Sequence, residues 1–199
     1  KRSRKGDAFI AEYDKSLIYD DPRKLELTTR AAYYTGLDTM PNNQNVPTSF
    51  ANLAAVAAKL AYTNTRRSQG SVDHEKGLRW KLAASAEHAD GETVPQLAGG
   101  LDFGFPLPLR NASVWLYSSG GVSQGERDNT LANFYFGGFG NNYVDDGDIK
   151  RYREYYSFPG FEIDEVSGQN FAKSVLELNL PPVRFEEVGT PALFLTWLR

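Results

Sequence analysis

The sequence contains no cysteine and only two histidines among its 199 residues. Without thiols the chain cannot build a disulfide framework or a thiolate metal site. The histidines, His74 and His88, have no third ligand at a recognisable metal-binding spacing. The sequence therefore predicts no metal site.

Long apolar runs are also missing, because no window approaches the roughly eighteen consecutive apolar residues of a transmembrane helix. The mean hydropathy is −0.48, which is typical of a soluble protein. A membrane β-barrel would give the same values, since its strands alternate lipid-facing and lumen-facing residues. An aromatic content of 13% suits the interfacial girdles of such a barrel and equally the core of a sandwich.

The sequence has no long block of basic residues. The net charge is −3 and no sustained basic block occurs, so we expect no nucleic-acid partner. Four of the first five residues are basic, but no apolar stretch typical of a signal peptide follows them. Because the chain opens in a polar run and stops within a strand pattern, we expect residues 1–199 to be one portion of a larger domain, truncated at both ends.

Two short patterns resemble a serine hydrolase motif and a calcium-binding loop, but the residues around them do not fit either function. Residues 121–125 match G-x-S-x-G, but a hydrolase needs a helix after this motif and a histidine later in the chain. The acidic run 145–148 lacks the ligand spacing of a calcium loop. We therefore predict that the protein is not an enzyme, has no catalytic residue and uses no cofactor.

What the sequence does contain is period-two alternation. In 172–180, alanine, serine and three leucines alternate with Lys173, Val175, Glu177 and Asn179, as one apolar and one polar face of a strand require. The alanine-rich segment 50–62 fits a helix or a strand, and continued alternation after Tyr62 favours the strand. Including these, about nine strands joined by turns are predicted: 7–19, 25–34, 50–62, 77–88, 93–107, 112–119, 131–140, 172–180 and 192–199.

A long aromatic loop precedes the strand 172–180. It carries Phe158-Pro159-Gly160-Phe161 and then Ser167-Gly168, and the strand after it ends at a proline. This arrangement resembles the C-terminal barrel of the bacterial surface antigen family, the outer-membrane assembly and translocation barrels. In that family the loop folds back into the lumen and carries an Arg-Gly-Phe triplet at its tip. Here Pro159 stands where the family has arginine, so the family's ion pair cannot be carried over.

The resemblance implies an all-β fold, an antiparallel up-and-down transmembrane β-barrel portion belonging to a barrel of about sixteen strands. It implies that residues 141–170 form the long in-folding loop. Either Arg151 or Arg153 takes over the missing arginine's role by reaching an inward acid such as Glu177, or the loop is held differently. The loop residues expected in the lumen are Phe158, Pro159, Gly160, Phe161 and Gly168, with Phe161 over Gly137 and Gly138 of the wall. The charged side chains expected to face the lumen are Arg79, Lys81, Glu87, Lys173 and Glu177.

The expected function follows from the resemblance: an outer-membrane barrel related to protein insertion and translocation machinery, acting through wall, lumen loop and strand pairing. Its partners would be the lipid bilayer and client outer-membrane proteins or periplasmic partner domains. The expected location is the outer membrane of a bacterium. The alternative is a soluble or cell-surface all-β binding module that uses its aromatic loops for contact.

Overall fold

The computed structural model describes residues 4–39, 50–71, 73–137, 157–158, 160–162, 165–181, 183–190 and 193–198. Every described segment is a strand or a connection, apart from one short 3-10 helix, η1 (Thr130–Ala132). In the described part of the chain, no helix has the length and apolarity needed to cross a membrane. The fold class is all-β, as the alternation predicts.

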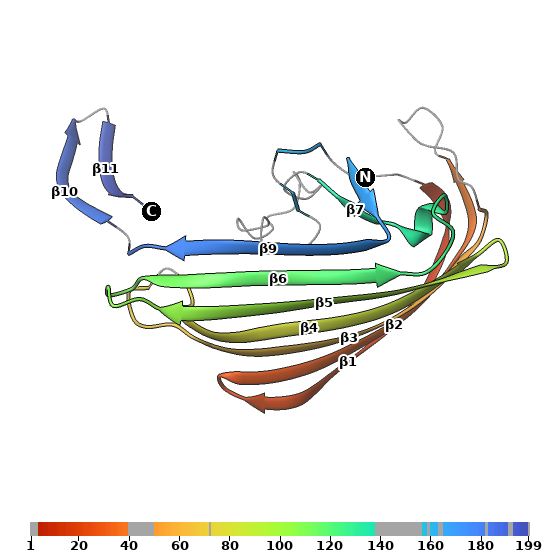
Figure 1. Ribbon diagram of the computed structural model, residues 1–199, viewed down its shortest axis with the longest axis horizontal. Helices are drawn as coiled ribbons and strands as arrows, with labels where there is room; N and C mark the ends of the chain where they lie inside the picture. The colour runs from red at the N-terminus through yellow and green to blue at the C-terminus, as the bar shows by residue number, and fades with distance from the viewer. Residues whose placement is uncertain are drawn as a thin grey trace.

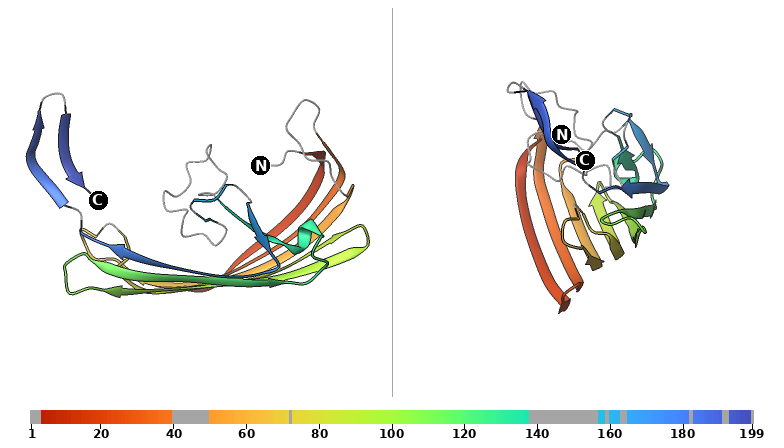
Figure 2. Two further views of the ribbon diagram at one scale, coloured as in Figure 1. Left: turned by 45° about the horizontal axis from the view of Figure 1, so that its top comes forward. Right: turned by 90° about the vertical axis from the view of Figure 1, so that its left-hand side faces the viewer.

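The main structure is one seven-stranded antiparallel sheet in the order β1-β2-β3-β4-β5-β6-β9. Consecutive strands lie side by side, so the connectivity is up-and-down. The sheet bends into a trough, with η1 and β7 on its concave side (Figures 1 and 2). The bounds of its strands are as follows: β1 Arg4–Asp20, β2 Arg23–Thr39, β3 Leu53–Arg66, β4 Lys76–Ala89, β5 Glu92–Pro106, β6 Ser113–Ser123 and β9 Asn170–Asn179.

Two short hairpins stand apart from this sheet. The strand β7 (Phe134–Phe136) pairs with β8 (Val166–Gly168), and β10 (Val183–Thr190) pairs with β11 (Leu193–Leu198). The alanine-rich segment forms β3 as predicted, because every residue from Leu53 to Asn64 finds a partner on β2. A single helix there could not have supplied those pairings.

The prediction that residues 131–140 form a wall strand is wrong. The strands β6 and β9 pair directly, from Ser113 opposite Asn179 to Val122 opposite Asn170, so no edge between them is open to a further strand. Among the described residues of that segment, 131–137, the only strand is β7, and it pairs with β8 in a separate two-stranded sheet. Residues 124–169, called the insertion below, therefore leave the wall after β6 and return to it at β9.

Candidate functional site on the concave face of the sheet

The contacts of Gly121 identify the side of the sheet that the insertion covers. A methyl group added at Gly121 would lie 2.5 Å from Cε1 of Phe171 and 3.0 Å from Cζ of Phe134. Phe134 belongs to β7 in the insertion, so Gly121 faces the concave side of the trough. Side chains alternate between the two faces along a strand, and directly paired residues share a face. The face of each residue in the sheet can therefore be counted from Gly121.

All five charged residues selected from the sequence share this face with Gly121. The β4–β5 and β5–β6 registers put Gly121 on the same face as Arg79, Lys81 and Glu87. The β6–β9 register does the same for Lys173 and Glu177. Their polar groups therefore lie on the side of the sheet that carries the insertion.

The outward face has the opposite character. Leu82, Leu176 and Leu178 lie there and are 48%, 73% and 57% exposed. Other large apolar side chains of this face are also exposed: Val56, Leu97, Leu101, Phe103, Leu116 and Val122. A continuous apolar surface of this kind is rare on a soluble monomer.

The first part of the insertion is fixed to the wall by side-chain amides. Nε2 of Gln96 on β5 donates to the carbonyl oxygen of Leu131 at 2.7 Å. Nε2 of Gln169 donates to the carbonyl oxygen of Gly125 at 2.8 Å, and Nδ2 of Asn129 donates to Glu92 at 2.9 Å. The bonds of Gln96 and Asn129 join the insertion to β5, and the bond of Gln169 joins the two ends of the insertion. The carbonyl groups of Gly125 and Leu131, which have left the sheet, are thereby satisfied.

An aromatic cluster continues this docking. Phe134 and Phe136 are both buried, and each ring meets Phe171 edge to face with centroids 4.9 Å apart. Edge-to-face pairs of this kind add about 0.5–1.5 kcal/mol beyond area burial. Since Phe171 belongs to β9 and faces Gly121 across the pair, the cluster joins the insertion to the wall.

The later part of the insertion is held by Lys173. Its Nζ donates a hydrogen bond of 2.6 Å to the carbonyl oxygen of Ser157, a residue with 0% exposure. Nothing in the local sequence marks Ser157 as an acceptor for Lys173, so this contact could not be predicted. The expected anchors Arg151 and Arg153, like Pro159 and Gly138, lie outside the described residues.

The tip residues of the predicted lumen loop lie close to this anchor in sequence. The rings of Phe158 and Phe161 meet edge to face with centroids 4.9 Å apart, and they remain 41% and 40% exposed. Gly160 lies in the turn between them, and Gly168 pairs with Phe134 in the β7–β8 hairpin. Gly137 directly follows β7 and is buried, so it belongs to the insertion and not to the wall.

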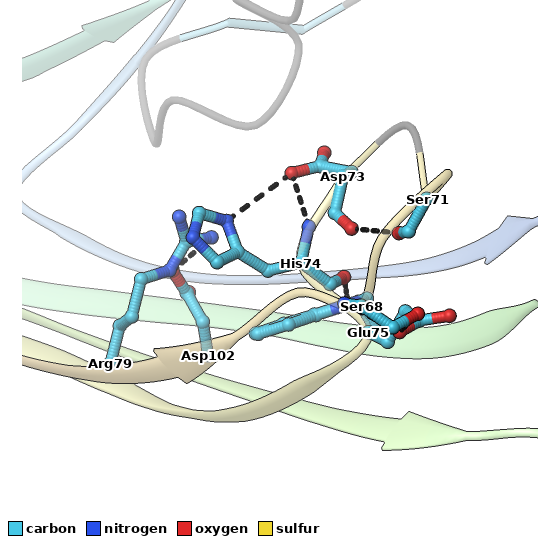
Figure 3. A network of polar contacts seen from close by, with 8 residues as sticks. Ser68, Ser71, Asp73, His74, Glu75, Arg79 and Asp102 are labelled. Carbon is cyan, nitrogen blue, oxygen red and sulfur yellow. Dashed lines mark hydrogen bonds and ion pairs between the residues drawn. The ribbon is translucent and has the colours of Figure 1, made fainter. Parts of the chain in front are cut away.

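A second cluster lies on the same face, nearer the turn between β3 and β4. Arg79 makes an ion pair with Asp102 at 3.2 Å, and its Cζ lies 5.2 Å from the ring of Trp115 and 5.7 Å from that of Tyr117. Such cation–π contacts contribute about 0.5–2 kcal/mol. Nε1 of Trp115 donates to the carbonyl oxygen of His74 at 2.7 Å, which connects the wall to the β3–β4 loop (Figure 3).

Neither cluster provides the elements of a catalytic or metal site. Among the described residues, no group of three or more histidines, aspartates and glutamates could hold a metal ion. Ser123 of the hydrolase-like motif ends β6, and the described residues that follow it contain η1 but no α-helix. The arrangement binds and positions chain segments by packing and hydrogen bonds.

One protein family model matches most of this chain. The family model of the OMP85 superfamily matches residues 24–188. That range begins in β2 and reaches β10, so it includes both clusters and the insertion. No curated protein and no solved structure matches the chain.

Proposed function

Because the chain belongs to the OMP85 superfamily, whose members are outer-membrane proteins for protein insertion and translocation, we propose that it forms part of a barrel wall that handles other proteins. Members of this superfamily are generally not enzymes, and we propose that this protein likewise acts without covalent chemistry. The proposed location is the bacterial outer membrane, with lipid on the outside of the wall.

The observation that carries the proposal is the division of the sheet into two faces. The outward face presents leucine, valine and phenylalanine side chains to the surroundings, while the concave face carries Lys81, Lys173 and the ion pair of Arg79 with Asp102. In water the outward face would be costly, but in a bilayer it would match hydrocarbon. A water-filled barrel interior tolerates the charges of the other face.

The open edge of the sheet fits the same proposal. Within the described residues, β1 pairs only with β2, so one edge of this strand of 17 residues has no ladder partner. Backbone groups in hydrocarbon must be paired, which is why only closed barrels cross membranes as sheets. We propose that further strands complete the wall, in the barrel of about sixteen strands expected from the family.

The proposed means of action combine the insertion with strand pairing. The described parts of the insertion dock on the concave face through the aromatic cluster and Lys173, which supports the proposal that the loop lines the interior of the barrel. Strand pairing at a seam would allow a client segment to gain backbone hydrogen bonds by β-augmentation. The proposed partners are therefore client outer-membrane proteins, alongside periplasmic partner domains.

The alternative, a soluble or cell-surface binding module, has weaker support. Its proposed contact surface was the aromatic loop region 134–161, but Phe134 and Phe136 are buried against Phe171. Extraction separates the two functions: a barrel needs detergent and migrates differently on gels when unheated, whereas a binding module does neither.

The direct test uses the full-length protein in liposomes made from bacterial outer-membrane lipids. A urea-unfolded outer-membrane porin is added, and its folding is followed by the gel shift between unheated and heated samples. We expect faster porin folding with the protein than with empty liposomes or with an unrelated reconstituted barrel. Equal rates in all three would contradict an insertion function, and export of an added client into the liposome would indicate translocation instead.

A further inference from the structure

The β3–β4 loop, residues 67–71 and 73–75, is folded onto the concave face at one end of the trough. Its own hydrogen bonds make it compact: the backbone N–H of Glu75 donates to the carbonyl oxygen of Arg66 at 2.9 Å. The carboxylate of Glu75 accepts from the backbone N–H and the hydroxyl of Ser68, at 3.0 Å for the N–H. The loop is therefore a defined unit with a preferred shape.

Trp115 is the wall residue that holds this unit. It is only 2% exposed and is among the largest fully buried side chains of the described residues. Its indole lies across Gly104 on β5, where an added methyl group would come within 2.3 Å of Cε2. From there Nε1 donates to the carbonyl oxygen of His74. His74 and its loop neighbours Asp73 and Glu75 are labelled in Figure 3.

The indole is itself fixed from the remaining sides. Tyr117 stacks on Trp115 with ring centroids 5.9 Å apart and an interplanar angle of 18°. The guanidinium of Arg79 covers both rings while its ion pair with Asp102 holds it in place. A buried tryptophan normally finds a partner for its N–H, and here the partner is a loop carbonyl from another part of the chain.

We propose that Trp115 is a latch that keeps the β3–β4 loop folded over the concave face and thereby narrows that end of the barrel interior. Release of the Trp115–His74 hydrogen bond frees the loop to swing away from the wall, and the interior opens at this end to ions and extended peptide. The inference rests on the proposed function only for the existence of an enclosed interior. The latch itself rests on the contacts of Trp115.

Two variants release the latch in different ways. Trp115→Phe keeps a ring on Gly104 but removes the N–H donor. Gly104→Ala keeps the donor but displaces the indole, because the new methyl group would overlap three indole carbons. Trp80→Phe is the matched control, since Trp80 lies on the opposite face of β4 and stacks on Tyr62. Migration of unheated samples on gels shows which variants are folded.

Loop release is measured by electron paramagnetic resonance of a nitroxide attached to Gln69→Cys. Gln69 is an exposed loop residue, and residues 1–199 contain no native cysteine. The spectrum is recorded in detergent for the full-length protein. A net hydrogen bond worth about 0.5–1.5 kcal/mol predicts a roughly two- to tenfold larger mobile fraction in Trp115→Phe. Gly104→Ala should give a similar increase and Trp80→Phe none. An unchanged mobile fraction in both latch variants would overturn the latch.

Opening is read by single-channel conductance in planar bilayers. We expect longer or larger open states in both latch variants than in the unmodified protein and in Trp80→Phe. A larger mobile fraction with unchanged conductance would contradict the proposal that the loop narrows the interior, but it would still support the proposal that Trp115 holds the loop. A protein that never enters the bilayer would overturn both the narrowing and the proposed function, whereas the nitroxide result in detergent still decides the latch.

Discussion

Lys173 on β9 donates a 2.6 Å hydrogen bond to the backbone carbonyl oxygen of Ser157. The two residues are 16 positions apart: Ser157 lies between β7 and β8, and Lys173 lies in β9. An ammonium group that binds a backbone carbonyl makes a charge-assisted bond, which is stronger than a neutral one. This bond is where the later part of the insertion meets the charged face of the wall.

The first prediction concerns that bond. Lys173→Met keeps the aliphatic stem and removes the donor, so docking of the later insertion should weaken by about 1.5–3 kcal/mol, the range for hydrogen bonds to charged groups. Limited proteolysis within residues 157–168 should become at least about tenfold faster, since 1.4 kcal/mol is a factor of ten in an equilibrium. Lys59→Met is the control, because Lys59 is an exposed lysine of the same face on β3. Similar cleavage rates in both variants would argue against an anchoring role.

The second prediction concerns the site where the aromatic cluster meets the wall. Gly121→Ala would bring a methyl group within 2.5 Å of Phe171 and 3.0 Å of Phe134, so the rings must move. Overpacking of this kind costs about 1–3 kcal/mol. The temperature at which unheated gel migration is lost should fall, and cleavage in 124–137 should become faster. Gly99→Ala should leave both unchanged, because its methyl group meets neighbours only at 3.6 Å and beyond.

The third prediction concerns the tip of the insertion. Phe161→Ala removes the edge-to-face contact with Phe158, worth about 0.5–1.5 kcal/mol. We expect proteolysis within residues 155–168 to accelerate roughly two- to tenfold by the same conversion. Leu176→Ala, which removes an exposed side chain from the outward face, serves as the control. Unchanged cleavage of Phe161→Ala would count against docking of this segment in the interior.

The fourth prediction tests the two faces directly. Nitroxides at Leu82 and Leu178, on the full-length protein in bilayers, should be relaxed by dissolved oxygen and protected from a water-soluble nickel chelate. A nitroxide at Lys59 on the concave face should show the opposite preference. If Leu82 and Leu178 were as accessible to the chelate as Lys59, the outward face would not be in lipid.

Much of the fold could be predicted from local sequence. Alternation with a period of two identifies strands and divides their residues into two faces, because successive side chains of a strand point in opposite directions. That rule groups Arg79, Lys81 and Glu87 on one face of their strand and Lys173 and Glu177 on one face of theirs. The strand pairing brings both groups to the same side of the sheet. It also resolved the alanine-rich segment, whose helix propensity was outweighed by pairing with both neighbouring strands.

The contacts between distant segments were decided only by the tertiary structure. Residues 131–140 alternate like a wall strand, but β6 and β9 pair directly with each other, so no place remained between them for a further strand. The role of Gly121 depends on which rings the register brings against it, and a glycine in a strand carries no sign of that. The same holds for Trp115, whose indole finds its acceptor at His74, 41 positions earlier. Local pattern determines which way a side chain points, whereas strand register and loop closure determine what it meets.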